Sequence, residues 1–311
     1  MTVHPQIAKA LDALAKANLP PIHTLSPEAA RELMGAMSRA RGGEPTPVRQ
    51  TEDRRIPGPA SEIPVRIYQP YERATGTLVY YHGGGHVIGD LDTHDKICRN
   101  LCVGADAVVV SVDYRMGPEH RFPAAVEDAW AALQWAAGAS AELGAPSGRL
   151  AVAGDSAGGN LAAVAALMAR DAGEPALGLQ ALIYPVVDYG LASDCYRRYG
   201  EGYGVLTDKA MAWFRDHYLA EPGQATDWRA SPVLAASFKG VAPALVLAAE
   251  CDVLHDDGVR IAAALKEGGV PTEFKLYPGM IHGFFGMAPD VDDAIAAQRQ
   301  VSDALRAAFA A

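Results

Sequence analysis

The first 45 residues place their apolar side chains at the spacing of helices. Ile7, Leu11 and Leu14 recur three or four positions apart, so they line one face of a helix. The run Ser26-Pro27-Glu28 has the features of a helix start: a capping residue, a proline in the first turn and an early acidic residue. The pattern predicts two helices ahead of the main body of the chain.

Beyond about Val48 the period changes, and short apolar runs alternate with helical segments. Ile63, Val65 and Ile67 occupy every second position, as in a half-buried strand. Further strand segments follow at residues 77–81, 107–112, 150–153, 179–184, 244–248 and 273–277, and helical segments such as 124–137 and 161–169 separate most of them. Strands that are apolar on both faces need helices on both sides. The sequence therefore predicts an α/β fold with a mainly parallel central sheet covered by helices on both faces.

One interval interrupts this alternation. Residues 186–233 contain turn residues, aromatic side chains and one helical segment around 207–219, but no clear strand. We expect this interval to fold with the N-terminal helices into a helical cap over one end of the sheet. The predicted division is N-terminal cap helices (1–45), the first part of the main domain (46–185), a cap insertion (186–233) and the second part of the main domain (234–311).

Composition and charge exclude several classes of partner. Of the 311 residues, 50% are hydrophobic and 21% are charged, which is typical of a globular protein with a sizeable core. The 37 acidic and 27 basic residues give a formal net charge of −10 at pH 7. A surface of that sign repels phosphate backbones and anionic lipid headgroups, so we expect no nucleic-acid partner and no membrane partner.

Neither a targeting segment nor a disulfide framework is recognisable. The N-terminus lacks an apolar signal region, and apolar runs elsewhere are too short to cross a bilayer, so we expect a cytoplasmic protein. Cys98 and Cys102 lie four positions apart in a helical pattern, whereas Cys195 and Cys251 stand alone. Because none of them shows zinc-site spacing, we expect buried, reduced thiols and no metal.

A serine in the pattern G-x-S-x-G gives the strongest chemical signal. The run Gly154-Asp155-Ser156-Ala157-Gly158 lies between strand segment 150–153 and helical segment 161–169, so Ser156 is on a sharp strand-to-helix turn. The flanking glycines remove side chains that would collide there, and the helix N-terminus favours negative charge beside the hydroxyl. This context predicts a nucleophile. The alternative is a plain glycine-rich turn with a capping serine.

Two downstream residues have the chemistry to activate that serine. A serine hydroxyl needs a base to take its proton and a carboxylate to orient the base. His282 and Asp252 each follow a strand segment, and therefore lie at the sheet edge that presents Ser156. The chain order Ser, Asp, His is that of α/β hydrolases rather than of trypsin-like or subtilisin-like enzymes. Asp256 and Asp257 compete for the carboxylate role, but they begin the next helix and we expect them to cap it.

A glycine run upstream supplies candidate oxyanion donors. His82-Gly83-Gly84-Gly85 follows strand segment 77–81, and residues without side chains let backbone N–H groups approach a developing oxyanion closely. We expect Gly83, Gly84 and Gly85 to form the oxyanion hole together with the N–H of Ala157. His82 is expected to anchor the loop by hydrogen bonding rather than to transfer protons.

With these motifs, the sequence resembles the hormone-sensitive-lipase-like carboxylesterases, the bacterial family IV esterases of the α/β-hydrolase fold, over about residues 78–285. The matching stretches are Tyr80 through Gly85, Val112-Asp113-Tyr114-Arg115, Pro118 through Ala125, Gly154 through Asn160, and His282-Gly283-Phe284. The chain departs from the family at Met116-Gly117, where Leu-Ala is usual, and at Val253, where proline is usual. Neither departure removes a candidate catalytic group.

The resemblance implies a serine carboxylesterase that hydrolyses short- to medium-chain acyl esters through an acyl-enzyme. It makes Ser156, Asp252 and His282 the triad, assigns the oxyanion hole to the glycine run and Ala157, and needs neither a cofactor nor a metal. The expected partner is a small-molecule ester, and a homodimer through an edge strand near the C-terminal helices is suggested by the family alone.

Two other functions remain open at this point. An amidase, arylformamidase or other deacetylase would use the same triad. A non-catalytic ligand-binding relative, like the plant gibberellin receptors, would lack the catalytic histidine that this chain has as His282.

Several further residues have two interpretations. Tyr203, Trp213 and Phe214 lie in the expected cap and are candidates for a substrate pocket, although a helix-packing stripe is the simpler interpretation of Trp213 and Phe214. The polar residues between Arg115 and Asp128 are expected to form structural ion pairs rather than a second catalytic site. His94 and Asp95 are expected to mark a helix start.

Overall fold

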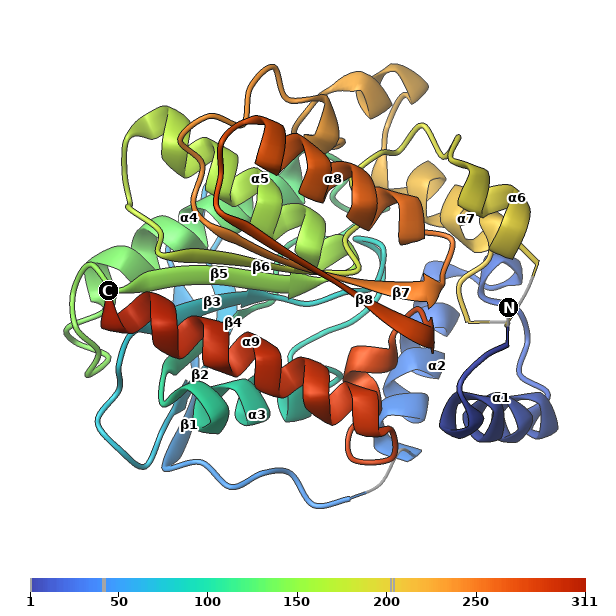
Figure 1. Cartoon of the computed structure of the whole chain (residues 1–311), viewed down its shortest axis with the longest axis horizontal. Helices are drawn as coiled ribbons and strands as arrows, with labels where there is room; N and C mark the ends of the chain where they lie inside the picture. Colours follow the sequence, from blue (N-terminus) through green and yellow to red (C-terminus); the bar gives the residue numbers. More distant parts are fainter. Residues whose placement is uncertain (1, 41–42, 202, 204) are drawn as a thin grey trace.

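One eight-stranded sheet organises the described part of the chain, residues 2–40, 43–201, 203 and 205–311 of the computed structural model. The strands are Gln50–Ile56 (β1), Ile63–Gln69 (β2), Thr77–Tyr81 (β3), Val108–Val112 (β4), Leu150–Asp155 (β5), Leu179–Ile183 (β6), Ala244–Cys251 (β7) and Thr272–Ile281 (β8). Their order across the sheet is β1-β2-β4-β3-β5-β6-β7-β8 (Figure 1). Antiparallel pairing joins β1 to β2 and β2 to β4, and the remaining neighbours are parallel.

Helices cover both faces of this sheet. They are Pro5–Ala17 (α1), Pro27–Ala40 (α2), Asp95–Ala105 (α3), Ala124–Ala139 (α4), Ala157–Ala172 (α5), Asp194–Tyr199 (α6), Asp208–Tyr218 (α7), His255–Glu267 (α8) and Asp292–Ala310 (α9). Short 3-10 helices span Ile22–Thr24 (η1), Pro222–Thr226 (η2), Pro232–Leu234 (η3) and Phe284–Met287 (η4). In Figure 1, α3 and α9 pack together on one face, and α4, α5 and α8 lie on the other. The expected α/β architecture is confirmed.

The register of the parallel strands brings their carboxyl ends to one edge. Tyr81 is level with Val112 on one side and Gly154 on the other. At the far end of the sheet, Cys251 is paired with Ile281 beyond an irregularity in β7. The loops that leave β3, β5, β7 and β8 therefore start close together.

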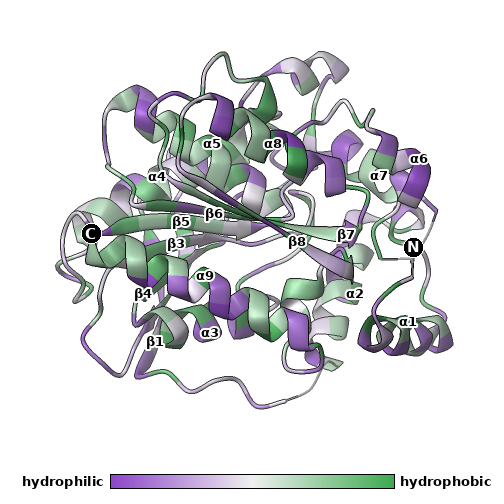
Figure 2. Ribbon diagram, viewed as in Figure 1, coloured by the Kyte–Doolittle hydropathy of each residue, from purple (hydrophilic) through white to green (hydrophobic). Residues whose placement is uncertain are grey.

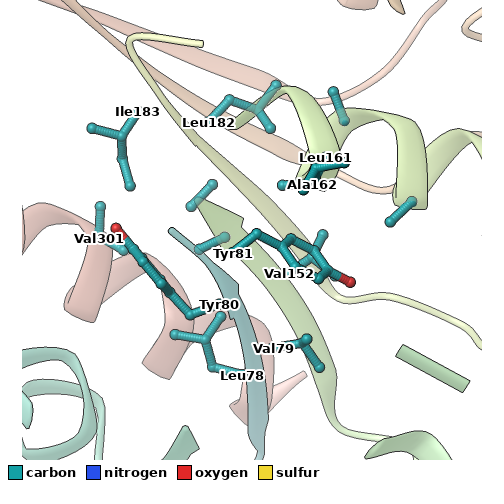
Figure 3. Close-up of a cluster of buried hydrophobic side chains, with 14 of the residues drawn as sticks. Leu78, Val79, Tyr80, Tyr81, Val152, Leu161, Ala162, Leu182, Ile183 and Val301 are labelled. Atoms are coloured by element: carbon teal, nitrogen blue, oxygen red, sulfur yellow. The ribbon is translucent and has the colours of Figure 1, made fainter. Parts of the chain in front are cut away.

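The core lies on both sides of the central strands. Leu78, Val79, Tyr80 and Tyr81 of β3 are all fully buried, which explains the continuous apolar run in the sequence. Figure 3 shows Tyr80 and Tyr81 leaving β3 in opposite directions. Figure 2 shows hydrophobic residues concentrated on the strands and on the helix faces turned toward them. Each of these side chains contributes roughly 1.5–3 kcal/mol by its removal from water.

The predicted strands are found within a few residues of their expected positions, and two features were not foreseen. Strand β1, whose sequence is mostly charged, has no apolar alternation and forms by antiparallel pairing with β2. Helix α6 within the interval 186–233 also lacks a clear sequence signal. Strands β7 and β8 run further than predicted, to Cys251 and Ile281.

Helix α2 and the preceding η1 pack against α7 over the loop that follows β3. The shared cluster contains Ala30, Val87, Ile88, Ala210 and Phe214, with Ile22, Leu25, Met34, Leu206 and Trp213 packed against it. In Figure 1, α1, α2, α6 and α7 lie toward the same end of the sheet. This packing agrees with a cap built from two separate stretches, whereas the division of the chain into domains remains a prediction.

Two buried histidines tie the loop after β3 to its surroundings. His86 Nδ1 lies 2.8 Å from the Tyr189 hydroxyl oxygen, and the imidazole stacks on Tyr218 with ring centroids 3.9 Å apart. His82 donates from Nδ1 to the Gly83 carbonyl oxygen at 2.7 Å, so it anchors the loop as expected. Burial, reinforced by a neighbouring histidine in each case, lowers the pKa of His86 to about 3 and the pKa of His82 to about 4.

Acidification should therefore destabilise the fold. Below pH 6.5 the unfolded chain protonates these imidazoles while the folded chain keeps them neutral. Their stabilising contribution is complete above pH 6.5 and is lost as the pH falls toward about 4. Since one pKa unit corresponds to about 1.4 kcal/mol, His86 alone should lower the free energy of unfolding by about 3 kcal/mol at about pH 4.5. Urea unfolding between about pH 7.5 and 4.5 measures this loss.

A matched pair of variants separates His86 from general acid effects. His86→Phe keeps the stacked ring and removes the titrating group, so its free energy of unfolding should depend less steeply on pH than that of the wild type. His23→Gln, in the partly exposed helix η1, should leave the slope unchanged. Parallel pH profiles for His86→Phe and the wild type would contradict this explanation.

Candidate active site

Ser156 lies on the sharp turn that joins β5 to α5. Its backbone has φ 56° and ψ −116°, a conformation that residues with side chains rarely adopt. The Ser156 N–H donates to the Ile183 carbonyl oxygen at 2.8 Å, which fixes the turn to the end of β6. Gly158 is required because a Cβ there would lie 1.8 Å from the Tyr81 carbonyl oxygen. The turn therefore holds the serine at the carboxyl edge of the sheet, where the sequence predicts it.

His282 and Asp252 form a continuous row with Ser156. His282 Nε2 lies 2.9 Å from the Ser156 Oγ, and His282 Nδ1 lies 2.7 Å from the Asp252 Oδ2. These two residues directly follow Ile281 and Cys251, which are paired across β8 and β7. The sheet register itself thus brings together the three side chains that the sequence selects.

The surroundings of this row fix the imidazole. The Asp252 side chain is fully buried, and its Oδ1 accepts the Leu254 N–H at 3.0 Å. The ring of Tyr184 lies 4.7 Å from the His282 ring, centroid to centroid. Ser156 and the His282 side chain remain 9% and 12% exposed. When Nδ1 donates to the carboxylate, Nε2 is left to accept the serine proton.

Asp256 and Asp257, the other candidates for the carboxylate that orients His282, are hydrogen-bonded to other segments. Asp257 is buried and its Oδ2 accepts the Val187 N–H at 2.8 Å, and burial raises its pKa to about 7. Asp256 accepts the Cys195 N–H at 3.2 Å. The expectation that they cap α8 is wrong, because each carboxylate reaches an amide of the segment after β6 instead.

The glycine loop approaches the serine turn with two residues in the left-handed region. Gly84 and Gly85 have φ of 121° and 63°, and a Cβ on Gly85 would lie 2.2 Å from the Phe214 ring. Gly83 does not fit its expected place in the oxyanion hole, because its N–H donates to the Asp155 Oδ1 at 3.1 Å. Ala157 is the first residue of α5, so its N–H has no carbonyl partner within the helix.

Asp155 is the site residue that the sequence analysis did not single out. Its carboxylate is buried between the Tyr80 hydroxyl at 2.7 Å, the Gly83 N–H at 3.1 Å and the His94 Nε2 at 3.4 Å. Burial alone would raise the pKa of Asp155, but His94 and Tyr80 outweigh it and the pKa lies below its usual value. An acid at the end of an otherwise apolar strand, next to the serine, was the available signal.

His94 has a different role from the expected one. It precedes α3 at the N-cap position, as predicted, but its side chain makes no capping hydrogen bond and reaches Asp155 instead. Asp95 binds the Tyr68 hydroxyl and the Arg99 guanidinium.

The candidate pocket aromatics separate into two groups. Phe214 is buried against Gly85, and Trp213 packs edge-on against it with centroids 5.1 Å apart. Tyr203 lies against Tyr199 of α6, 6.3 Å between ring centroids. Of these three aromatics, Phe214 lies against the glycine loop at Gly85, and a lining role for the three stays a prediction.

The polar run from Arg115 to Asp128 forms ion pairs, as expected. The Arg115 guanidinium binds the buried Asp128 carboxylate at 2.8 Å. Glu119 pairs with Arg31 of α2 at 2.7 Å, and this contact lowers the pKa of Glu119 to about 2. These pairs join the loop below the site to α4 and to the N-terminal helices.

Comparisons with known proteins identify the family of this chain. A family model described as the alpha/beta hydrolase fold matches residues 78–286. "Carboxylic ester hydrolase LipN" of Mycobacterium tuberculosis is 44% identical over 90% of this chain and 76% of its own length. "Ethyl acetate hydrolase" of Pseudomonas putida is 36% identical over 98% of this chain and 99% of its own. A hyperthermophilic esterase of Pyrobaculum calidifontis, 41% identical, superimposes with a TM-score of 0.95 over 100% of both chains.

The helices give no sign of a membrane span: in the described ranges, none combines the length and the apolar character that crossing a bilayer requires. The resemblance found in the sequence is confirmed by these relatives. They are named as an ester hydrolase, an ethyl acetate hydrolase and an esterase, and this chain aligns with most of the length of each. From its strand order, its serine turn and the family model that covers most of it, the chain belongs to the α/β-hydrolase family.

Proposed function

We propose that this protein is a serine carboxylesterase of the hormone-sensitive-lipase-like type, acting on short- to medium-chain acyl esters. The observation that carries the proposal is the row of contacts from Ser156 through His282 to Asp252, at 2.9 Å and 2.7 Å. The names of the relatives, which include a carboxylic ester hydrolase and an ethyl acetate hydrolase, support the same reaction.

In the first half-reaction, the Ser156 Oγ attacks the ester carbonyl carbon while its proton passes to the His282 Nε2. The imidazolium that forms is stabilised by the buried Asp252 carboxylate on Nδ1. When the tetrahedral intermediate collapses, the same Nε2 proton goes to the leaving alcohol. The product of this step is an acyl ester of Ser156.

The oxyanion that develops on the former carbonyl oxygen needs preorganised donors. Gly84, Gly85 and Ala157 are the candidates, since the N–H of Gly83 is bonded to Asp155. The two glycines adopt positive φ values, which glycine reaches without strain, so the loop can keep this shape before substrate arrives.

The second half-reaction repeats the first with water. His282 takes a proton from the water that attacks the acyl-enzyme, then returns it to the Ser156 Oγ as the acid leaves. These steps use side chains of this chain alone, so the proposed reaction proceeds without a cofactor.

The substrate class follows from the surroundings of the site. Helix α2, η1 and α7 pack together over the glycine loop, which favours small soluble esters over lipid aggregates. The net charge of −10 favours neutral esters over anionic ones. The cap division, the cytoplasmic location and a homodimer belong to this proposal as well.

Hydrolysis of p-nitrophenyl esters of increasing chain length tests the function directly. Wild type should hydrolyse the short and medium esters, and Ser156→Ala should lose about 10⁴-fold or more in kcat because the nucleophile is gone. Paired ester and amide substrates distinguish an esterase from an amidase. A wild type inactive on every ester, or an active alanine variant, would show that the mechanism is wrong and would favour a ligand-binding protein.

Replacement of Asp252 by Asn tests the orienting carboxylate. The amide keeps the size of the side chain but cannot stabilise an imidazolium, so kcat should fall by about 10³–10⁴-fold. Asp257→Asn is the matched control, because this buried acid accepts the Val187 N–H, whereas the Nδ1 of His282 is bonded to Asp252. A loss below about 10-fold in Asp252→Asn, or equal losses in both variants, would count against the assignment.

Asp155→Asn tests whether the buried carboxylate positions the oxyanion loop. Weaker binding of the Gly83 N–H should let the neighbouring amides shift, which lowers kcat by about 10- to 100-fold and leaves KM nearly unchanged. Asp128→Asn, which removes a buried acid paired with Arg115, should reduce stability without changing kcat. If Asp155→Asn and Asp128→Asn lower Tm by the same amount and also lower kcat by the same factor, Asp155 does not position the loop.

A further inference from the structure

Three side chains of types that bind metals meet between α6 and α8. Cys195 lies in α6, and His255 and Asp256 begin α8. One ligand atom from each, the Sγ, a ring nitrogen and a carboxylate oxygen, all lie within 4.8 Å of one another. Because 60 residues separate Cys195 from His255, local sequence spacing gives no sign of this group.

The distances between these atoms are close to the edges of a tetrahedral metal site. The Cys195 Sγ lies 3.7 Å from the His255 Nδ1, and that nitrogen lies 3.1 Å from the Asp256 Oδ1. Bonds of about 2.3 Å to sulfur and about 2.0–2.1 Å to nitrogen and oxygen give tetrahedral edges of about 3.5 Å and 3.3 Å. These two distances are therefore within a few tenths of an ångström of the edges that an ion bound to all three atoms would require, and the third pair, the Cys195 Sγ and the Asp256 carboxylate oxygen, lies within 4.8 Å.

The carboxylate of this trio is already oriented. The Asp256 Oδ2 accepts the N–H of Cys195 at 3.2 Å, which leaves Oδ1 facing the imidazole nitrogen. Metal ligands are commonly held by a second hydrogen bond of this kind. The same contact joins the backbone of α6 to the first turn of α8.

Solvent can reach the trio. Cys195 is buried, but the side chains of His255 and Asp256 are 20% and 30% exposed. Water can therefore reach these two side chains. A thiolate and a carboxylate also neutralise a divalent ion, so the complex carries no net charge at this half-buried place.

We propose that Cys195, His255 and Asp256 form a binding site for a borderline divalent metal ion of the Zn²⁺ or Co²⁺ type, with water as the fourth ligand. The thiol proton is released to solvent when Cys195 binds as thiolate. A sulfur and an imidazole nitrogen select against Mg²⁺ and Ca²⁺, which prefer oxygen. The proposal differs from the expectation of no metal and does not depend on the proposed esterase function.

The proposed metal site lies next to Asp252, the acid in the row of Ser156, His282 and Asp252. The His255 N–H donates to the Asp252 carbonyl oxygen at 3.1 Å, so His255 lies one turn from the acid that binds His282. An ion held here would fasten the segment after β6 to the turn that carries Asp252. We therefore expect bound metal to stabilise the folded protein.

Co²⁺ titration of the full-length, chelator-treated protein tests the site. Wild type should bind one Co²⁺ per chain and develop the near-ultraviolet charge-transfer absorption of a cobalt–thiolate bond, which Zn²⁺ should abolish by displacement. Zn²⁺ at about 100-fold excess over its Kd should raise Tm by about 5 °C, whereas Mg²⁺ and Ca²⁺ should have no effect.

Matched variants locate the bound ion. Cys195→Ser should remove the charge-transfer band, and His255→Gln should weaken binding at least 10-fold. Since His255 is partly exposed, the second variant remains informative even if the first fails to fold. Cys102→Ser, a buried thiol of α3 outside the trio, should bind like wild type. The proposal is overturned if wild type shows no cobalt–thiolate band, or if His255→Gln binds Co²⁺ as tightly as wild type.

Discussion

The close approach of Gly158 to the Tyr81 carbonyl oxygen sets the distance on which the rest of the site depends. No side chain fits between the first turn of α5 and the end of β3. The contact fixes the serine turn relative to the loop that leaves β3, and thereby fixes Ser156 relative to the amides of Gly84 and Gly85. Any larger residue at position 158 must push α5 away from the sheet and widen this separation.

Asp155 links the same two segments by charge rather than by shape. Its backbone belongs to β5 and its carboxylate holds the Gly83 amide and the Tyr80 hydroxyl of the neighbouring strand and loop. A buried acid with these partners costs desolvation energy, which charge-assisted hydrogen bonds offset. The arrangement favours one loop geometry over others, and in that geometry the amide of Gly83 is already bonded.

The fold and the catalytic row follow from sequence because they depend on local patterns. The apolar run of β3 predicts a strand buried on both faces, and the order of Ser156, Asp252 and His282 at strand ends predicts their meeting. Strand β1 was not predicted, because its charged residues form a strand only by pairing with β2. A similar reason explains why the hydrogen bonds of three carboxylates, Asp155, Asp256 and Asp257, were not predicted. Each carboxylate bonds to a segment that is distant in sequence, and no nearby sequence pattern indicates that segment.

The stacked ring of His86 has a consequence for how this protein can vary. The imidazole touches Tyr189, close to the start of the interval 186–233, and Tyr218, the last residue of α7. Both ends of the stretch between these tyrosines are therefore anchored to the loop that carries Gly84 and Gly85. Insertions or deletions between the two anchors can change the length of this stretch while the glycine loop stays in place, so the chain can vary here without moving the loop that is bonded to Asp155.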